Sequence, residues 1–115
     1  AYIKFRRLSV SAKIRGIPFT VNKQLFVEWL NLQSRKCYYC GVEESILSSN
    51  EDRKQKKLTV DRKDNSIGYV EGNLCLACFR CNNLKSNFFT SEEWMEIATK
   101  IIKPRIKEYH NFDNT

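Results

Sequence analysis

Residues 58–86 read LTVDRKDNSIGYVEGNLCLACFRCNNLKS, and this stretch decides the expected fold. It contains two short runs with β-strand character, at residues 58–60 and 73–76. A turn is expected between them at residues 65–68, because Asn, Ser and Gly gather there. A helix is expected to begin at Cys78. The order of elements is therefore strand, strand, helix.

Cysteines are paired on both sides of this pattern. Cys37 and Cys40 form one CxxC pair, and Cys78 and Cys81 form a second. Thiolates are preferred ligands of structural zinc, and two CxxC turns complete a tetrahedral shell. Because four sulfurs leave no open coordination position, the spacing predicts one structural zinc per chain. Two disulfides, or redox chemistry at one pair, are the competing interpretations.

The cysteine count also bears on the compartment. The chain has 5 cysteines, an odd number, and residues 1–10 do not resemble a secretory signal. We therefore expect an intracellular, reducing compartment and no secretion. Cys75, the fifth cysteine, is expected to fill a buried position rather than bind metal. No apolar run approaches the ~20 residues that span a bilayer, so no membrane partner is expected.

Positive charge is concentrated in parts of the chain. The formal net charge is +7, and residues 1–27 contain Lys and Arg but no acid. A second basic cluster lies within residues 53–63. Such an excess favours a polyanionic partner, because phosphate contacts release counterions. A basic surface that serves only solubility is the simpler alternative.

The sequence predicts a single domain over residues 1–115. It consists of a basic N-terminal arm, a core, and a C-terminal helix with a tail. Residues 1–22 are the basic N-terminal arm, with residues 1–18 irregular or partly helical. The core at 23–89 starts with a helix over 23–33, which Asn22 caps and whose buried face carries Leu25, Phe26, Trp29 and Leu30. Residues 43–57 are expected to form an exposed loop.

The C-terminal segment, 90–115, is predicted to be a helix and a tail. Thr90 and Glu93 fit a capping box. Pro104 is expected to kink or end the helix. An apolar stripe should pack this helix onto the core; its residues are Trp94, Ile97, Ala98, Ile101 and Ile102.

The string Gly-Tyr…Gly-Asn-Leu…Cys-x-x-Cys-Asn-x-x-Lys within residues 68–85 resembles the HNH, or ββα-metal, endonucleases. Small phage and mobile-element members with flanking CxxC pairs are the most similar. The resemblance runs from about Arg15 through the final helix. It implies an α+β fold: a small zinc-stapled core of two antiparallel strands and a helix, with flanking helices. It also implies the cytoplasm of a bacterial or phage-infected cell.

The resemblance assigns roles to three residues of the quoted stretch. Asp61 and Asn82 match the family's ligands of a catalytic divalent ion, and Asn73 matches the asparagine that holds the loop in shape. A carboxylate and an amide oxygen suit Mg²⁺ or Mn²⁺. The resemblance thus implies metal-assisted hydrolysis of DNA phosphodiester bonds. The ion would stabilise charge on the leaving 3′ oxygen.

The chain departs from the family at one catalytic position. Arg62 stands where the general-base histidine is usual, and an arginine, with a pKa above about 12, is not an ordinary base. Arg62 is instead suited to gripping a phosphate with two N–H groups. The proton acceptor would then be Tyr69, which we favour here if the Arg62 cation lowers its pKa, or Asp64, or hydroxide on the metal or bulk solvent. His110, the only histidine, is interpreted as a surface residue.

DNA is the expected partner, and six basic residues are expected to bind its phosphates. They are Arg6, Arg7, Lys13, Arg15, Lys63 and Lys85. Lys85 has a plain solvated lysine as its alternative interpretation. Both a monomer and a homodimer on DNA fit the sequence. A zinc-dependent DNA-binding module without catalysis is the main alternative function, and an RNA-directed nuclease or binder is a third.

Overall fold

The computed structural model of the chain describes residues 2–48 and 50–106. Within them the chain forms two compact units. The first unit contains the residues up to Ser34 together with Arg62–Cys75, and the second contains Arg35–Asp61 and the residues from Leu76 onward. None of the described helices is both long and apolar enough to span a membrane.

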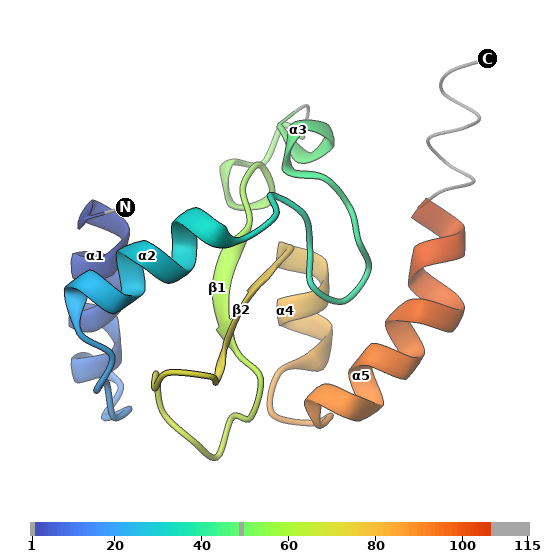
Figure 1. Cartoon of the computed structure of the whole chain (residues 1–115). Helices are drawn as coiled ribbons and strands as arrows, with labels where there is room; N and C mark the ends of the chain where they lie inside the picture. The colour runs from blue at the N-terminus through green and yellow to red at the C-terminus, as the bar shows by residue number, and fades with distance from the viewer. Residues whose placement is uncertain (1, 49, 107–115) are drawn as a thin grey trace. The chain divides into compact units, whose positions relative to one another are not determined.

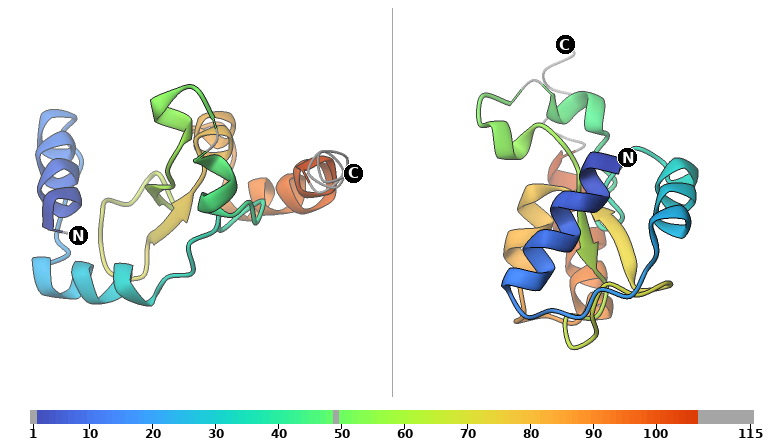
Figure 2. Two further views of the ribbon diagram at one scale, coloured as in Figure 1. Left: turned by 90° about the horizontal axis from the view of Figure 1, so that it is seen from above. Right: turned by 90° about the vertical axis from the view of Figure 1, so that its left-hand side faces the viewer.

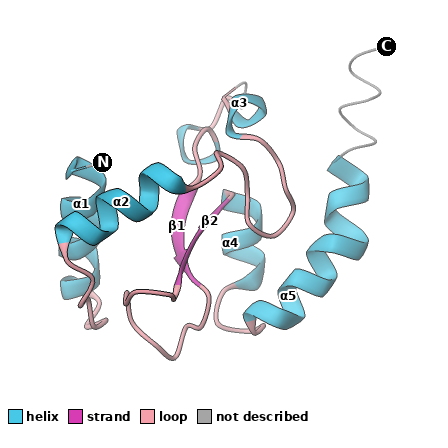
Figure 3. Ribbon diagram, viewed as in Figure 1, coloured by secondary structure: helices cyan, strands magenta, loops and turns pink. Residues whose placement is uncertain are grey.

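The structure contains a two-stranded sheet that is followed along the chain by one helix, in the order that the sequence predicts (Figures 1 and 3). Strand β1 is Thr59–Arg62, and strand β2 is Leu74–Ala77. The strands are antiparallel, because Thr59 bonds to Ala77 at one end and Lys63 bonds to Asn73 at the other. Helix α4, Phe79–Lys85, follows β2 directly. The structure therefore confirms an α+β fold with a ββα core.

Two helices belong to the first unit. Helix α1 is Tyr2–Ile14, so of the two alternatives for residues 1–18 the structure favours the partly helical one. Helix α2, Lys23–Leu32, begins where predicted, and the Asn22 side chain accepts a hydrogen bond from the Leu25 amide. Figure 2 shows the turn that joins these two helices.

Aromatic packing joins α1 to the segment that follows it. The Phe5 ring lies 5.4 Å from that of Phe19 and 5.5 Å from that of Phe26, measured between centroids. Phe26 and Leu30 are buried as expected, but Leu25 is exposed. Since Leu25 lies in the first turn of α2, its side chain falls at the rim of the packed face. Tertiary packing therefore makes the buried stripe narrower than the sequence predicts.

Residues 43–57 are more structured than the predicted exposed loop. They contain α3, Glu44–Leu47, and a 3-10 turn, Arg53–Gln55. The Glu44 carboxylate accepts hydrogen bonds from the Arg35 guanidinium, at 2.9 and 3.1 Å, and from the Leu58 amide, at 2.9 Å. The side chain of Glu44 thus fixes the backbone just before β1.

The C-terminal helix starts at the predicted capping box. The Thr90 hydroxyl accepts from the Glu93 amide at 3.1 Å, and the Glu93 carboxylate accepts from the Thr90 amide at 2.9 Å. Helix α5, Ser91–Ile97, continues into a π-helical turn, Ala98–Ile102. Trp94 and Ala98 are buried, whereas Ile101 is exposed.

Of the two outcomes expected at Pro104, a kink or an end of the helix, the second is wrong. Helical backbone continues through residues 103–106, and the departure from α geometry lies in the turn before the proline. A proline lacks the N–H of a regular helix, and its ring crowds the preceding turn. The wider π turn therefore lets the chain pass Pro104 while remaining helical.

Thr90→Ala should lower the free energy of unfolding by about 1 kcal/mol, because it leaves the Glu93 amide without its cap. Urea denaturation followed by tryptophan fluorescence measures this. Thr99→Ala is the matched control, since Thr99 is an exposed residue of the same helix and does not cap it. Its effect should stay within about 0.5 kcal/mol. Equal losses in the two variants would contradict the capping role.

Candidate metal centre and active site

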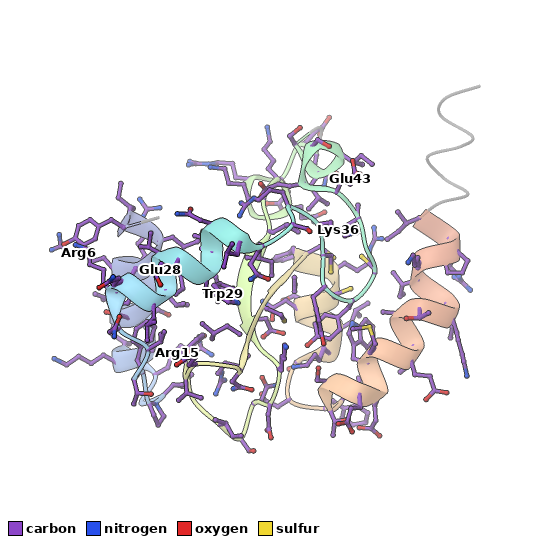
Figure 4. All side chains as sticks on the ribbon, in the orientation of Figure 1. Arg6, Arg15, Glu28, Trp29, Lys36 and Glu43 are labelled. Carbon is purple, nitrogen blue, oxygen red and sulfur yellow. The ribbon has the colours of Figure 1, made fainter. Side chains whose placement is uncertain are left out.

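The first cysteine pair lies in a tight knuckle of the second unit. Lys36 and Glu43, both labelled in Figure 4, form an antiparallel bridge across it. Inside the bridge the Cys37 amide donates to Val42 O at 2.9 Å, and the Gly41 amide donates to Cys37 O at 3.0 Å. Gly41 has φ +78°, a left-handed conformation that side chains disfavour. The turn therefore brings both sulfurs to one side.

The second pair begins α4. Cys78 is the N-cap residue, and its sulfur accepts from the Cys81 amide at 3.4 Å. The sulfurs of Cys37, Cys40, Cys78 and Cys81 lie within 4.8 Å of one another, and all four residues are buried. All five cysteines lie in the described part of the chain and are free, so the disulfide interpretation is wrong. Cys75 is buried and is not one of the four, as expected.

The four thiols cannot all ionise unless a cation balances their charge. Hydrogen bonds from the other sulfurs, that of Cys40 first, hold the pKa of the Cys37 thiol well below its ordinary value. The hydrogen bond with Cys37 is the largest of the effects that raise the pKa of Cys81 far above its ordinary value. The hydrogen bonds that favour the thiolate form of Cys37 thus disfavour the thiolate form of Cys81. A cation at the centre would remove this conflict, so the cluster can hold a metal ion.

Asp61 lies in β1, and its carboxylate belongs to the second unit with α4. Its Oδ2 atom lies 3.6 Å from Nζ of Lys85, and the two side chains are 11% and 1% exposed. Lys85 is therefore neither a solvated lysine nor, in this conformation, a residue that reaches a DNA phosphate. Both sequence interpretations of Lys85 need this correction. The burial of its ammonium is explained by the adjacent carboxylate.

Asn82, the second proposed ligand, lies in α4 three residues before Lys85. Residues three apart on a helix share one face, so Asn82 and Lys85 lie on the same side of α4. Asp61 from β1 contacts the side chain of Lys85, which belongs to that face. Carboxylate and amide oxygens together form a donor set that fits Mg²⁺ or Mn²⁺.

Asn73 organises the loop between the strands in the first unit. Its Oδ1 accepts from the Asp64 amide at 2.9 Å, and its Nδ2 donates to Asp64 O at 3.1 Å and to Gly68 O at 2.9 Å. A Cβ atom on Gly68 would overlap Pro18, so the close approach of these segments requires glycine. One amide side chain therefore fixes both ends of the loop.

Arg62 and Tyr69 contact each other in the same unit. Nη1 of Arg62 donates to Asn65 O at 3.0 Å and to Ile67 O at 3.2 Å, and the guanidinium lies 5.4 Å from the Tyr69 ring centroid. Tyr69 is buried and packs on Phe19 at 5.5 Å. Its carbonyl accepts from the Thr20 amide. This geometry favours a packing role for Tyr69.

Four basic residues of the N-terminal segment are exposed. They are Arg6, Arg7, Lys13 and Arg15. Figure 4 labels Arg6 and Arg15, and it shows the Arg6 side chain projecting from α1. Lys63 is half-buried beside the loop. The surface interpretation of His110 falls outside the described residues.

Two functional contacts escaped the sequence reasoning. Glu44 binds Arg35 and the Leu58 amide, although its segment reads as a polar loop. The pairing of Lys85 with Asp61 was also missed. The sequence does contain an indication of this pairing, because Lys85 lies one turn after Asn82 on the helix that must face the proposed metal. The spacing alone did not distinguish that position from a solvated one.

Three comparisons with known proteins place the chain. No protein-family model matches it. It is 31% identical over 85 residues to an uncharacterized protein, R423, of Acanthamoeba polyphaga mimivirus; this covers 74% of the chain but only 13% of that relative.

The chain is also similar to a solved structure, that of the rare-cutting HNH restriction endonuclease PacI, which is described as exhibiting an extraordinary mechanism of DNA perturbation. The TM-score is 0.79 at 33% sequence identity, and the match covers 96% of this chain and 80% of PacI. The chain therefore belongs to the HNH endonuclease family.

Proposed function

We propose that the chain is a DNA endonuclease that hydrolyses phosphodiester bonds with one divalent ion held by Asp61 and Asn82. The observation that carries this proposal is the contact of Asp61 with Lys85, a residue that shares a face of α4 with Asn82. The similarity to an HNH restriction endonuclease supports DNA as the substrate. Mg²⁺ or Mn²⁺ bound there would supply stabilisation of the charge that develops on the leaving 3′ oxygen.

Arg62 has two tasks in this proposal. Nη1 braces the loop carbonyls of Asn65 and Ile67, which orients the guanidinium. The rest of the planar group then grips a phosphate oxygen of the substrate. A lysine at this position would keep the positive charge but not the planar set of N–H donors. It would therefore lose both the hydrogen bonds to the loop carbonyls and the two-point contact with phosphate.

The proton acceptor is Asp64 in our proposal. Tyr69, the residue that the sequence favoured, is only 4% exposed, and water would reach its hydroxyl poorly. Asp64 is exposed, and its Oδ1 accepts from the amide and hydroxyl of Ser66 at 2.9 and 2.6 Å. These bonds hold the carboxylate in one orientation, as a general base requires.

Helix α1 and the residue after it supply much of the proposed DNA contact. A hollow of about 700 Å³ lies along this segment, and Arg6, Arg7 and Arg15 help to line it. Arginine forks suit phosphate oxygens, and their charge steers the protein to a polyanion. A homodimer on DNA stays a prediction.

The ion in the four-sulfur cluster is zinc in our proposal. Four thiolates in a closed shell suit zinc and leave no position for substrate, so its role is structural. The ion would join the knuckle at Cys37 to the start of α4.

A DNA-binding module without catalysis is the second candidate. Arg62 in the usual base position and the Lys85 cation beside Asp61 are the observations that favour it. Digestion of supercoiled plasmid and branched DNA with Mg²⁺ or Mn²⁺ separates the two candidates. Nicks that require the metal support the endonuclease, and tight binding without nicks supports the module.

Elemental analysis should find one zinc per folded chain, and a strong chelator should unfold the protein, because metal binding supplies folding free energy. Cys40→Ser should lose the zinc. Cys75→Ser is the matched control, since it changes a buried cysteine outside the cluster, and it should keep the zinc. Retention of zinc by Cys40→Ser would refute the four-sulfur site.

Asp61→Ala should abolish cutting while DNA affinity survives, because the positive charges elsewhere provide most of that affinity. Nicking assays and binding isotherms at several salt concentrations measure the two effects separately. Asp52→Ala, which removes an exposed acid outside the proposed site, should cut normally. Cutting by Asp61→Ala at the wild-type rate would show that the active site lies elsewhere.

Tyr69→Phe should change the cutting rate by less than about tenfold, whereas Asp64→Asn should lower it by ~10²–10⁴, the usual loss for a general base. Phe keeps the ring packing, and Asn keeps the acceptor for Ser66, so both variants should fold. Single-turnover nicking across pH measures the rates. The reverse pattern would restore Tyr69 to the mechanism.

A further inference from the structure

Lys85 is a buried cation that the proposed chemistry does not use. Its side chain is 1% exposed, and an ammonium loses much of its hydration at such a position. The Asp61 carboxylate lies 3.6 Å away and is itself 11% exposed. Lys100 and Glu96 form an ion pair at 2.7 Å in the same unit, but with side chains 69% and 65% exposed. Only the first pair is held where water screens little.

The position of Lys85 relates it to the proposed metal site. Lys85 shares a face of α4 with Asn82, and it contacts Asp61 from β1. Its ammonium therefore lies beside one proposed ligand, Asp61, and its backbone position is one helical turn from the other, Asn82. A positive charge there repels a second cation and competes with it for the same carboxylate.

We propose that Lys85 is a positioning residue that serves as a built-in counter-cation for Asp61. It neutralises the buried carboxylate in the metal-free protein and holds it against α4. It also weakens the affinity of the site for free divalent ions, so that the free protein carries little of the catalytic metal. The second effect rests on the proposed function of Asp61 as a metal ligand, whereas the first does not.

A double-mutant cycle tests the pairing. Lys85→Met and Asp61→Asn each remove one charge with little change of volume, and each should lower the melting temperature of the zinc-loaded protein by roughly 10 °C. The double variant should lose less than the sum of the singles, because the interaction between the two side chains can be lost only once. In the matched control cycle, Lys100→Met and Glu96→Gln should have small and additive effects. Additive losses at Lys85 and Asp61 would overturn the pairing.

Mn²⁺ binding tests the competition, with free Mn²⁺ measured by electron paramagnetic resonance. Lys85→Met should bind Mn²⁺ about tenfold more tightly than the wild type, because the repelling charge is gone. A merely structural role would not tighten binding. Lys100→Met should bind as the wild type does. Unchanged or weaker binding by Lys85→Met would overturn the competition.

The two proposals fail in different ways. If Asp61 is not a metal ligand, Asp61→Asn and the wild type bind Mn²⁺ equally and the proposed function fails, while the melting-temperature cycle still decides the pairing. If Asp61→Asn abolishes Mn²⁺ binding but Lys85→Met does not strengthen it, the proposed function stands and the counter-cation role is overturned.

Discussion

Four buried cysteine sulfurs lie close together in the second unit. The conformation of the chain around them depends on how their negative charge is neutralised. Cys37 and Cys40 arrive from a glycine-closed knuckle, and Cys78 and Cys81 from the start of α4. Ionisation of one thiol opposes ionisation of the next. A central cation would resolve this conflict and would cross-link segments that lie far apart in sequence. A small domain with a thin core gains much from such a link.

The same unit contains a second buried negative charge, and a side chain neutralises it. The carboxylate of Asp61 is balanced by the ammonium of Lys85, which arrives from α4. Because α4 begins at Cys78, the sulfur cluster also fixes the helix that carries Lys85 and Asn82. The structural cluster thereby determines which face of α4 the proposed catalytic carboxylate meets.

In the first unit, hydrogen bonds take the place of buried charge. The Asn73 side chain makes hydrogen bonds with four backbone groups of the loop, and Arg62 donates to two of the loop carbonyls. Polar side chains that satisfy several backbone groups at once hold an irregular loop in one conformation. These bonds hold the loop that carries Asp64 and Tyr69 in one conformation. The arginines of α1, in contrast, are exposed to solvent.

The sequence by itself determined the strand–strand–helix order, the helix caps at Asn22 and Thr90, and the four-cysteine cluster, since each depends on short spacing or local backbone chemistry. Membership of the HNH family followed from fixed offsets within residues 68–85. Only the tertiary structure decided that Lys85 is buried, that Leu25 is exposed and that Glu44 binds the Leu58 amide. Burial depends on what packs against a side chain from distant parts of the chain, and local periodicity does not contain that information.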